Sequence, residues 1–147
     1  MVITDLDVLR QVGAELGLEL VEDTTYKWYG RWVKDYNADD AAYKHGISPE
    51  NYGKCDGWKL RIKDNPSAYE IGLHKNPNGE GFVLVYDFYG TPGHALREKI
   101  GEKGEKIKQG YSLALAKKHL TKKGFKVVGQ QTTEDGKKVR LQLQRGY

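Results

Sequence analysis

The chain has 147 residues, of which 30% are charged and 38% hydrophobic, and its formal net charge is +4. These values favour one soluble globular domain over residues 1–147, with enough chain to bury an ordinary core. No window approaches eighteen apolar residues, which excludes a membrane-spanning stretch, and the single cysteine, Cys55, excludes an internal disulfide. The first residues lack the basic and apolar segments of a signal peptide, so we expect a cytoplasmic location.

Positive charge is concentrated toward the C-terminus. Residues 94–147 contain fourteen Lys or Arg against five Asp or Glu, whereas residues 1–93 contain ten against fifteen. Such asymmetry indicates a positive face that attracts a polyanion. The alternative is that these lysines only solvate the outer side of a helix and a hairpin.

The N-terminal segments are predicted to be a helix and a strand. Apolar residues recur at helical spacing over residues 5–16, and Gly17 is a suitable helix end. Residues 18–22 then alternate apolar and acidic side chains, as a half-buried strand does.

Residues 26–33, YKWYGRWV, combine rings and cations. Rings of this kind stack bases and cations neutralise phosphates, which favours nucleic-acid binding. A strand with one wet face and one core face is the alternative. The candidate ligand-binding residues here are Lys27, Tyr29, Arg31 and Trp32.

Residues 35–57 are predicted to form a long loop or insertion, because Gly, Pro, Asn and Asp are scattered through them without a sustained period. Aromatic residues in this segment indicate that it packs against the domain. His45, Asp39, Asp40 and Cys55 match no zinc-binding spacing. We therefore predict neither a metal site nor a cofactor.

Three strands joined by short turns follow, at about residues 58–63, 69–74 and 82–88, and they predict an antiparallel meander. The last of them is apolar on both faces, which favours a central position in the sheet. The first presents Lys59, Arg61 and Lys63 on one face, and these are further candidate ligand-binding residues.

Residues 89–94 are predicted to break the chain, with one or two helical turns at 95–100. The glycines at 101 and 104 are not followed by the Gly-Lys-Ser/Thr of a phosphate loop, so we predict a hinge or helix start. No complete catalytic motif occurs, and we expect a protein that is not an enzyme. Asp87 and His94 are the pair to inspect for weak catalysis.

The C-terminal third is the most regular part of the sequence. Its pattern predicts a helix over residues 105–123 that Gly124 ends, then a hairpin around Asp135-Gly136. The whole chain is thus predicted to be α+β: an antiparallel meander sheet with an N-terminal helix, one long C-terminal helix and a closing β-hairpin. The candidate ligand-binding residues in this part are Lys103, Lys106 and Arg140.

The segments AYEIGLHKNPNGEGFVLVYDF and GYSLALAKKHLTKKGFKVVGQQTTEDGKKVRLQLQR resemble the Ycf thirty-five-like family, small proteins of plastids, cyanobacteria, other bacteria and bacteriophages. The family pairs a Tyr-Gly-Ile-like strand with a Gln-x-Tyr helix, a Gly-Phe stop and an EDG hairpin that ends in an aromatic residue. The matching positions are 69–73, 109–111, 124–125 and 134–136 with Tyr147, within a resemblance over about residues 68–147. The insertion at 35–57 and Ala114 depart from the pattern. Because the family has no established activity, the resemblance implies no catalytic residues.

The expected function is non-enzymatic binding of a polyanionic ligand, either a nucleic acid or a nucleotide signal, through basic and aromatic side chains. The alternative is a protein–protein adaptor anchored by exposed aromatic residues of the 35–57 loop. The sequence leaves open the identity of the ligand, the strand order, the oligomeric state and the role of the insertion.

Overall fold

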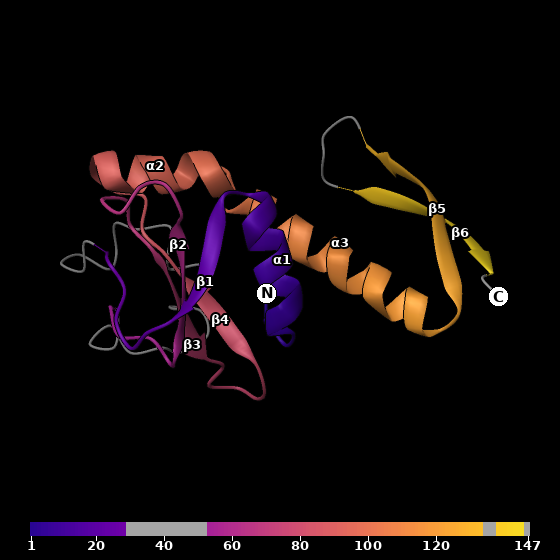
Figure 1. Cartoon of the computed structure of the whole chain (residues 1–147), viewed down its shortest axis with the longest axis horizontal. Coiled ribbons are helices and arrows are strands. Elements are labelled where there is room, and N and C mark those ends of the chain that lie inside the picture. The colour runs from indigo at the N-terminus through magenta and orange to yellow at the C-terminus, as the bar shows by residue number, and fades with distance from the viewer. Residues whose placement is uncertain (29–52, 134–137, 146–147) are drawn as a thin grey trace.

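The computed structural model describes residues 1–28, 53–133 and 138–145 (Figure 1). In chain order the elements are α1 (Leu6–Glu15), β1 (Leu18–Glu22), β2 (Trp58–Ile62), β3 (Ile71–Lys75), β4 (Phe82–Val85), α2 (Gly90–Ile100), α3 (Glu105–Lys122), β5 (Phe125–Thr132) and β6 (Val139–Arg145). The protein is α+β, with the N-terminal helix, long C-terminal helix and closing hairpin that the sequence predicts. Most of the loop predicted at 35–57 lies outside the described residues.

Strands β1 to β4 form one sheet in chain order, and each pairs antiparallel with the next. The predicted meander is therefore confirmed. Leu18 lies opposite Ile62 and Leu20 opposite Leu60, so the apolar residues of β1 and β2 share one face.

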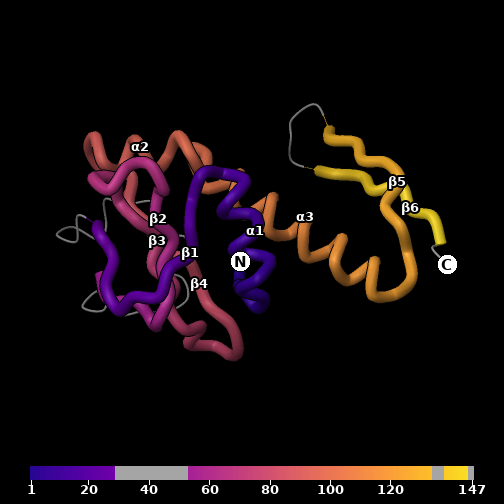
Figure 2. The backbone as a smooth tube through the Cα atoms, in the orientation of Figure 1, coloured from indigo at the N-terminus to yellow at the C-terminus, as the bar shows by residue number. Residues whose placement is uncertain are grey.

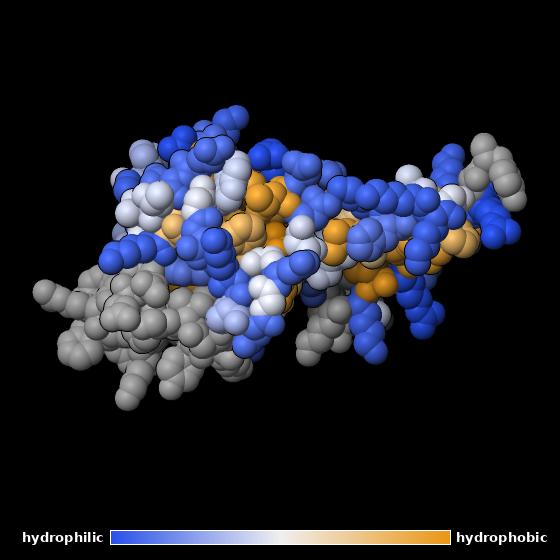
Figure 3. All heavy atoms as spheres, turned by 90° about the horizontal axis from the view of Figure 1, so that it is seen from below, coloured by the Kyte–Doolittle hydropathy of each residue, from blue (hydrophilic) through white to orange (hydrophobic). Residues whose placement is uncertain are grey.

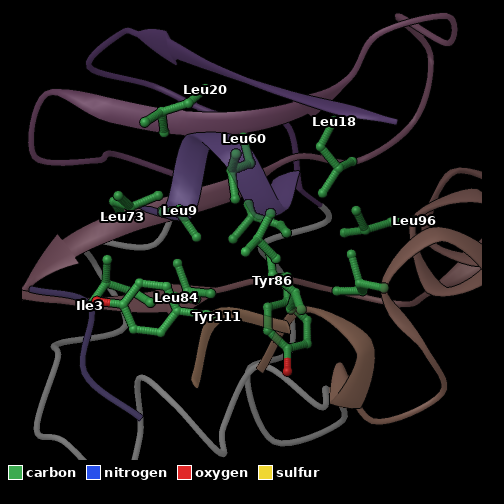
Figure 4. Packing of buried hydrophobic residues seen from close by; sticks show 14 of the residues in the cluster. Ile3, Leu9, Leu18, Leu20, Leu60, Leu73, Leu84, Tyr86, Leu96 and Tyr111 are labelled. Atoms are coloured by element: carbon green, nitrogen blue, oxygen red, sulfur yellow. The ribbon is translucent and has the colours of Figure 1, made fainter. Parts of the chain in front are cut away.

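That face of the sheet packs against all three helices around one hydrophobic core (Figure 4). The strands contribute alternate residues to it, because side chains one apart point to opposite faces. Its helical members are Val8, Leu9 and Val12 of α1, Leu96 and Ile100 of α2, and Ile107 and Tyr111 of α3.

Strand β4 lies at an edge of the sheet, and the central position predicted for it is wrong. Three of its four residues are nevertheless buried, and Val83 and Val85 are both 0% exposed. Ile3 exchanges two backbone hydrogen bonds with Phe82, of 2.7 and 2.8 Å, and so covers part of the free edge. Apolar residues on both faces of a strand indicate that both faces are buried. They do not indicate whether another strand pairs with each of its two edges.

Helix α2 begins at Gly90, so the break predicted over residues 89–94 is also wrong. Pro92 lies in the first turn, where a missing N–H leaves no intrahelical hydrogen bond unmade. Gly93 packs closely on the backbone of Phe88, where a larger side chain would overlap with it. The glycine and proline residues that led to the prediction of a break therefore form the first turn of a helix.

Helix α3 is attached to the start of α1 through Tyr111. This side chain is 2% exposed, and its hydroxyl oxygen accepts hydrogen bonds from the backbone N–H groups of Thr4 (2.9 Å) and Asp5 (3.1 Å). Asp5 in turn caps α1 by accepting from the N–H of Val8 at 3.0 Å. One buried ring thus joins the long helix to the N-terminal cap of the first.

Two further contacts fix the same junction. The carboxylate of Asp5 forms an ion pair with Lys118 at 2.6 Å, and this hydrogen bond holds the pKa of Asp5 below its ordinary value. At Gly110 an added Cβ atom would lie 2.8 Å from Cγ1 of Val12. Glycine therefore lets α3 approach α1 more closely than any larger residue would.

Beyond this junction, the second half of α3 and the hairpin extend away from the sheet (Figures 1 and 2). Gly124 follows the helix with a φ of 85°, which reverses the chain at little cost for glycine. Strands β5 and β6 then form a separate two-stranded sheet, and Lys117 donates a hydrogen bond of 2.7 Å to the side chain of Gln130 across the gap between α3 and β5. We call residues 105–145 the arm.

No helix in the described ranges is both long and apolar enough to cross a membrane.

Replacing Tyr111 by Phe is expected to lower the free energy of unfolding by about 2 kcal/mol, because two partly buried N–H groups lose their acceptor while the ring stays in place. Urea denaturation followed by circular dichroism measures this loss. Ser112→Ala removes an exposed hydroxyl from the next position of the same helix and is the control, with a change below about 0.5 kcal/mol. Equal stability of the two variants would show that the hydroxyl does not hold this junction.

Candidate functional site

Lys59 lies on the face of the sheet opposite the helices, where it is the centre of an ion cluster. Its ammonium nitrogen is 3.0 Å from the carboxylate of Asp23 and 3.1 Å from that of Glu70. The side chains of Lys59 and Glu70 are only 11% and 8% exposed. Glu70 also accepts a hydrogen bond of 2.8 Å from the backbone N–H of Lys27. Lys59 therefore neutralises carboxylates of its own chain.

The electrostatics agree with this assignment. Burial alone would lower the pKa of Lys59, but its hydrogen bonds to Asp23 and Glu70 outweigh burial and raise the pKa above its ordinary value. The hydrogen bond from Lys59 lowers the pKa of Asp23, helped by the N–H groups of Thr25 and Thr24. Lys59 is held by both carboxylates through short contacts, so it is not available to an external phosphate.

The other predicted cations of the sheet region differ in their surroundings. Arg61 forms an ion pair with Glu19, its cross-strand neighbour. The ammonium group of Lys27 donates to the carbonyl oxygen of Pro66. Lys63 is exposed and, within the described residues, pairs with no carboxylate. Tyr29, Arg31 and Trp32 lie outside the described residues, so the stacking role predicted for them stays a prediction.

Lys103 and Lys106 lie where α2 meets α3, in a setting of mixed charge. A shallow hollow there is lined by Glu98, Glu102 and Glu105 as well as by Lys106, and Glu105 accepts a hydrogen bond of 2.8 Å from the N–H of Lys103. Arg97 also lines this hollow, so three carboxylates are balanced by Arg97, Lys106 and the neighbouring Lys103, and little net attraction for an anion remains.

Asp87 and His94, the pair suggested for weak catalysis, lie in different environments. Asp87 is 0% exposed and accepts a hydrogen bond of 2.8 Å from the backbone N–H of Tyr89. His94 is exposed, and its Nδ1 lies 2.7 Å from the guanidinium group of Arg97. Each side chain has a local partner in the fold, and these contacts do not indicate a shared proton.

The remaining buried polar groups are also held by the fold. Burial lowers the pKa of His74, whose Nε2 lies 2.9 Å from the hydroxyl of Tyr26. Burial, with the charge of Asp23 adding to it, raises the pKa of the Cys55 thiol to about 11. A thiol with that pKa is protonated at neutral pH and is a poor nucleophile and metal ligand. Among the residues described, no group of three His, Cys, Asp or Glu is arranged to hold a metal ion.

The arm differs from the rest of the protein because its acidic residues are few: Glu105 at its start, beside Lys106, and Glu134 and Asp135 between the two hairpin strands. Residues 106–133 contain seven lysines, residues 138–145 contain three further cations, and neither range contains Asp or Glu. Of these ten, Lys118 alone is paired to a carboxylate in the described structure. The others are Lys106, Lys108, Lys117, Lys122, Lys123, Lys126, Lys138, Arg140 and Arg145.

These cations are also close enough for their potentials to add. The helical residues from Lys117 to Lys122 span only about 8 Å of helix axis, which is comparable with the Debye length of about 8 Å at physiological ionic strength. Figure 3 shows hydrophilic side chains projecting on both sides of the arm, with hydrophobic atoms between them. The last turns of α3 therefore carry a cluster of positive charge within the arm.

Sequence reasoning found only part of this element. Arg140 and Lys106 belong to the predicted ligand-binding residues, but Lys122, Lys123 and Lys126 were not among them, because lysine is common on exposed helix surfaces. The signal that identifies them is the absence of acidic residues from 106 to 133, since an ordinary solvated helix carries both signs of charge.

Comparison with protein-family models, with curated proteins and with solved structures finds no match to this chain. The resemblance to the Ycf thirty-five-like family therefore stays a prediction.

Replacing Lys59 by Met is expected to lower the free energy of unfolding by about 3 kcal/mol, because Glu70 stays buried without its cation. Arg61→Met is the matched control on the same strand and the same face, and loss of its exposed ion pair should cost at most about 1 kcal/mol. Urea denaturation of both variants measures the difference. Similar losses would mean that Lys59 is as replaceable as a surface cation.

The pH dependence of stability should show the same cluster. The pKa of Asp23 is lower in the folded protein than its ordinary value of 3.8. Its contribution is therefore complete above pH 3.8 and is lost as the pH falls through the folded value. Lys59→Met removes the first cause of this shift, so the acid limb of its stability curve should be shallower than that of the wild type. Parallel acid limbs in urea titrations would contradict this assignment.

Proposed function

We propose that the protein binds a polyanionic ligand, a nucleic acid or a nucleotide, through the cations of the arm. The observation that supports this most is the run of ten Lys and Arg over residues 106–133 and 138–145 without one Asp or Glu. Cations that only solvate a fold are normally interspersed with acids, because unrelieved like charge repels itself. A phosphate chain that lies along the arm relieves this repulsion.

The physical mechanism is charge neutralisation. A lysine or arginine beside a phosphate displaces a condensed counterion, and the gain in counterion entropy makes binding depend steeply on salt. Nine of the ten cations have no carboxylate partner among the described residues. They are therefore able to meet phosphates without first breaking an internal ion pair.

The proposal assigns binding to the arm in preference to the sheet. Lys59 and Arg61 are engaged by Asp23, Glu70 and Glu19, and a phosphate would have to displace these carboxylates. Stacking by Tyr29 and Trp32 remains part of the expectation from the sequence. The alternative function is that of a protein–protein adaptor anchored by aromatic residues of 35–57. A failure to bind polyanions would favour this alternative.

A triple variant, Lys122→Gln, Lys123→Gln and Lys126→Gln, is expected to weaken binding of a short fluorescent DNA and of heparin at low salt. It should also flatten the plot of log affinity against log salt by up to about 3 units, because each phosphate contact contributes about 0.9. Fluorescence anisotropy between about 50 and 200 mM salt measures both effects.

The matched control carries Lys54→Gln, Lys75→Gln and Lys99→Gln, three exposed lysines of the body with the same total change in charge. Its salt dependence should equal that of the wild type. If both triple variants lose affinity equally, binding follows net charge alone and the arm is not the site. If the wild type binds neither DNA nor heparin, the proposed function is wrong.

A further inference from the structure

The hairpin of the arm has two faces of different character. One face is turned toward α3, as the hydrogen bond between Lys117 and Gln130 shows, and it carries half-buried Phe125, Val127 and Leu141. The cross-strand pairs Lys126–Gln144, Gly129–Gln142 and Gln131–Arg140 lie on the other face. That outer face is exposed at every one of these positions except Gly129.

The outer face contains three glutamines, one lysine, one arginine and one glycine, and no carboxylate. At Gly129 an added Cβ atom would lie 2.6 Å from Oε1 of Gln142, so the glycine provides space for that amide to lie across the ribbon. A shallow hollow lies at this part of the ribbon, and its lining combines Gly129, Gln131, Arg140 and Gln142 with Gln130 and Leu141 of the neighbouring cross-strand pair. Apart from Val128, which is 48% exposed at the register shift between Val127 and Gly129, this surface is a row of neutral amides and cations.

The dimensions of this ribbon suit a DNA groove. Two paired strands are about 5 Å apart, and the major groove, about 12 Å wide, admits a two-stranded ribbon with its side chains. Side chains on one face of a strand recur every two residues, about 6.7 Å, which is close to two base-pair steps of about 3.4 Å. Arg140, Gln142 and Gln144 follow one another at this spacing along β6.

The chemistry of the side chains suits the same groove. Glutamine forms paired hydrogen bonds with adenine and arginine with guanine, so amides and guanidinium groups recognise base edges. Cations at the two ends of the ribbon, Lys122 and Lys123 before β5 and Lys138 before β6, are placed for phosphates. Phosphate contacts orient a protein on the duplex, while base contacts give sequence preference.

We propose that β5 and β6 enter the major groove of duplex DNA and that Gln131, Arg140, Gln142 and Gln144 contact its base edges. This inference rests on the proposed function, because the arm must first attract a polyanion. It adds the class of ligand, a B-form duplex, and the groups that select sequence.

The test compares the wild type with two neutral double variants that keep the net charge. Gln142→Ala with Gln144→Ala removes two amides of the outer face, and Gln11→Ala with Gln109→Ala removes two exposed amides elsewhere. Each protein is used to select duplexes from a random DNA library, and anisotropy then measures binding to the selected duplex, its single strand, the same sequence as duplex RNA, and heparin. Circular dichroism confirms that each variant is folded.

The wild type and the control should enrich a common sequence and bind it at least tenfold more tightly than random duplex. The outer-face variant should lose this preference and keep its affinity for heparin. Preference for the single strand overturns the inference, as does duplex RNA bound as well as DNA, because the major groove of A-form RNA is too narrow to enter. Binding to all polyanions with no enrichment overturns the inference and leaves the proposed function standing. Binding to none overturns both.

Discussion

The placement of the arm depends on the contact between Tyr111 and the N-terminal segment. Two backbone N–H groups at the start of α1 donate to one buried hydroxyl, and Asp5 at the same point caps α1 and pairs with Lys118. The first turns of α3 belong to the core, whereas its later turns carry cations into solvent. Together with buried Ile107 and the close approach of Gly110 to Val12, this junction fixes the direction of the helix relative to the sheet.

Charge is organised differently on the two sides of the junction. On the sheet, Lys59 and Arg61 are balanced by carboxylates that the fold brings to them. On the arm, the sequence has no carboxylate from 106 to 133, and among the described residues the fold brings Asp5 to Lys118 and Glu98 and Glu102 to the hollow at Lys106. Internal pairing of this kind stabilises a structure, while unpaired charge destabilises it and suits an external ligand. The buried cation of the sheet, Lys59, is therefore neutralised within the fold, whereas most cations of the arm have no carboxylate partner among the described residues.

Local patterns predicted the elements well and their partners less well. Helical spacing together with Gly124 located α3 to within one residue, and strand alternation located β1 and β2. The edge position of β4 and the cluster around Lys59 were missed because both depend on contacts between distant segments. Asp23 and Glu70 reach Lys59 from opposite sides in the sequence, and nothing in the alternation of β2 reports them. The acid-free run of the arm was visible in the sequence, but its significance depends on α3 leaving the core.

The separate two-stranded sheet has a thermodynamic consequence. A hairpin of two strands is marginally stable alone, and β5–β6 is supported mainly by one side of α3. Its opening is therefore a local event of low free energy that leaves the four-stranded sheet intact. Part of the binding free energy of a ligand on the hairpin would be used to shift the hairpin from its open form to its closed form. Ligand binding would therefore slow amide hydrogen exchange in β5 and β6 at ligand concentrations too low to raise the melting temperature of the whole chain.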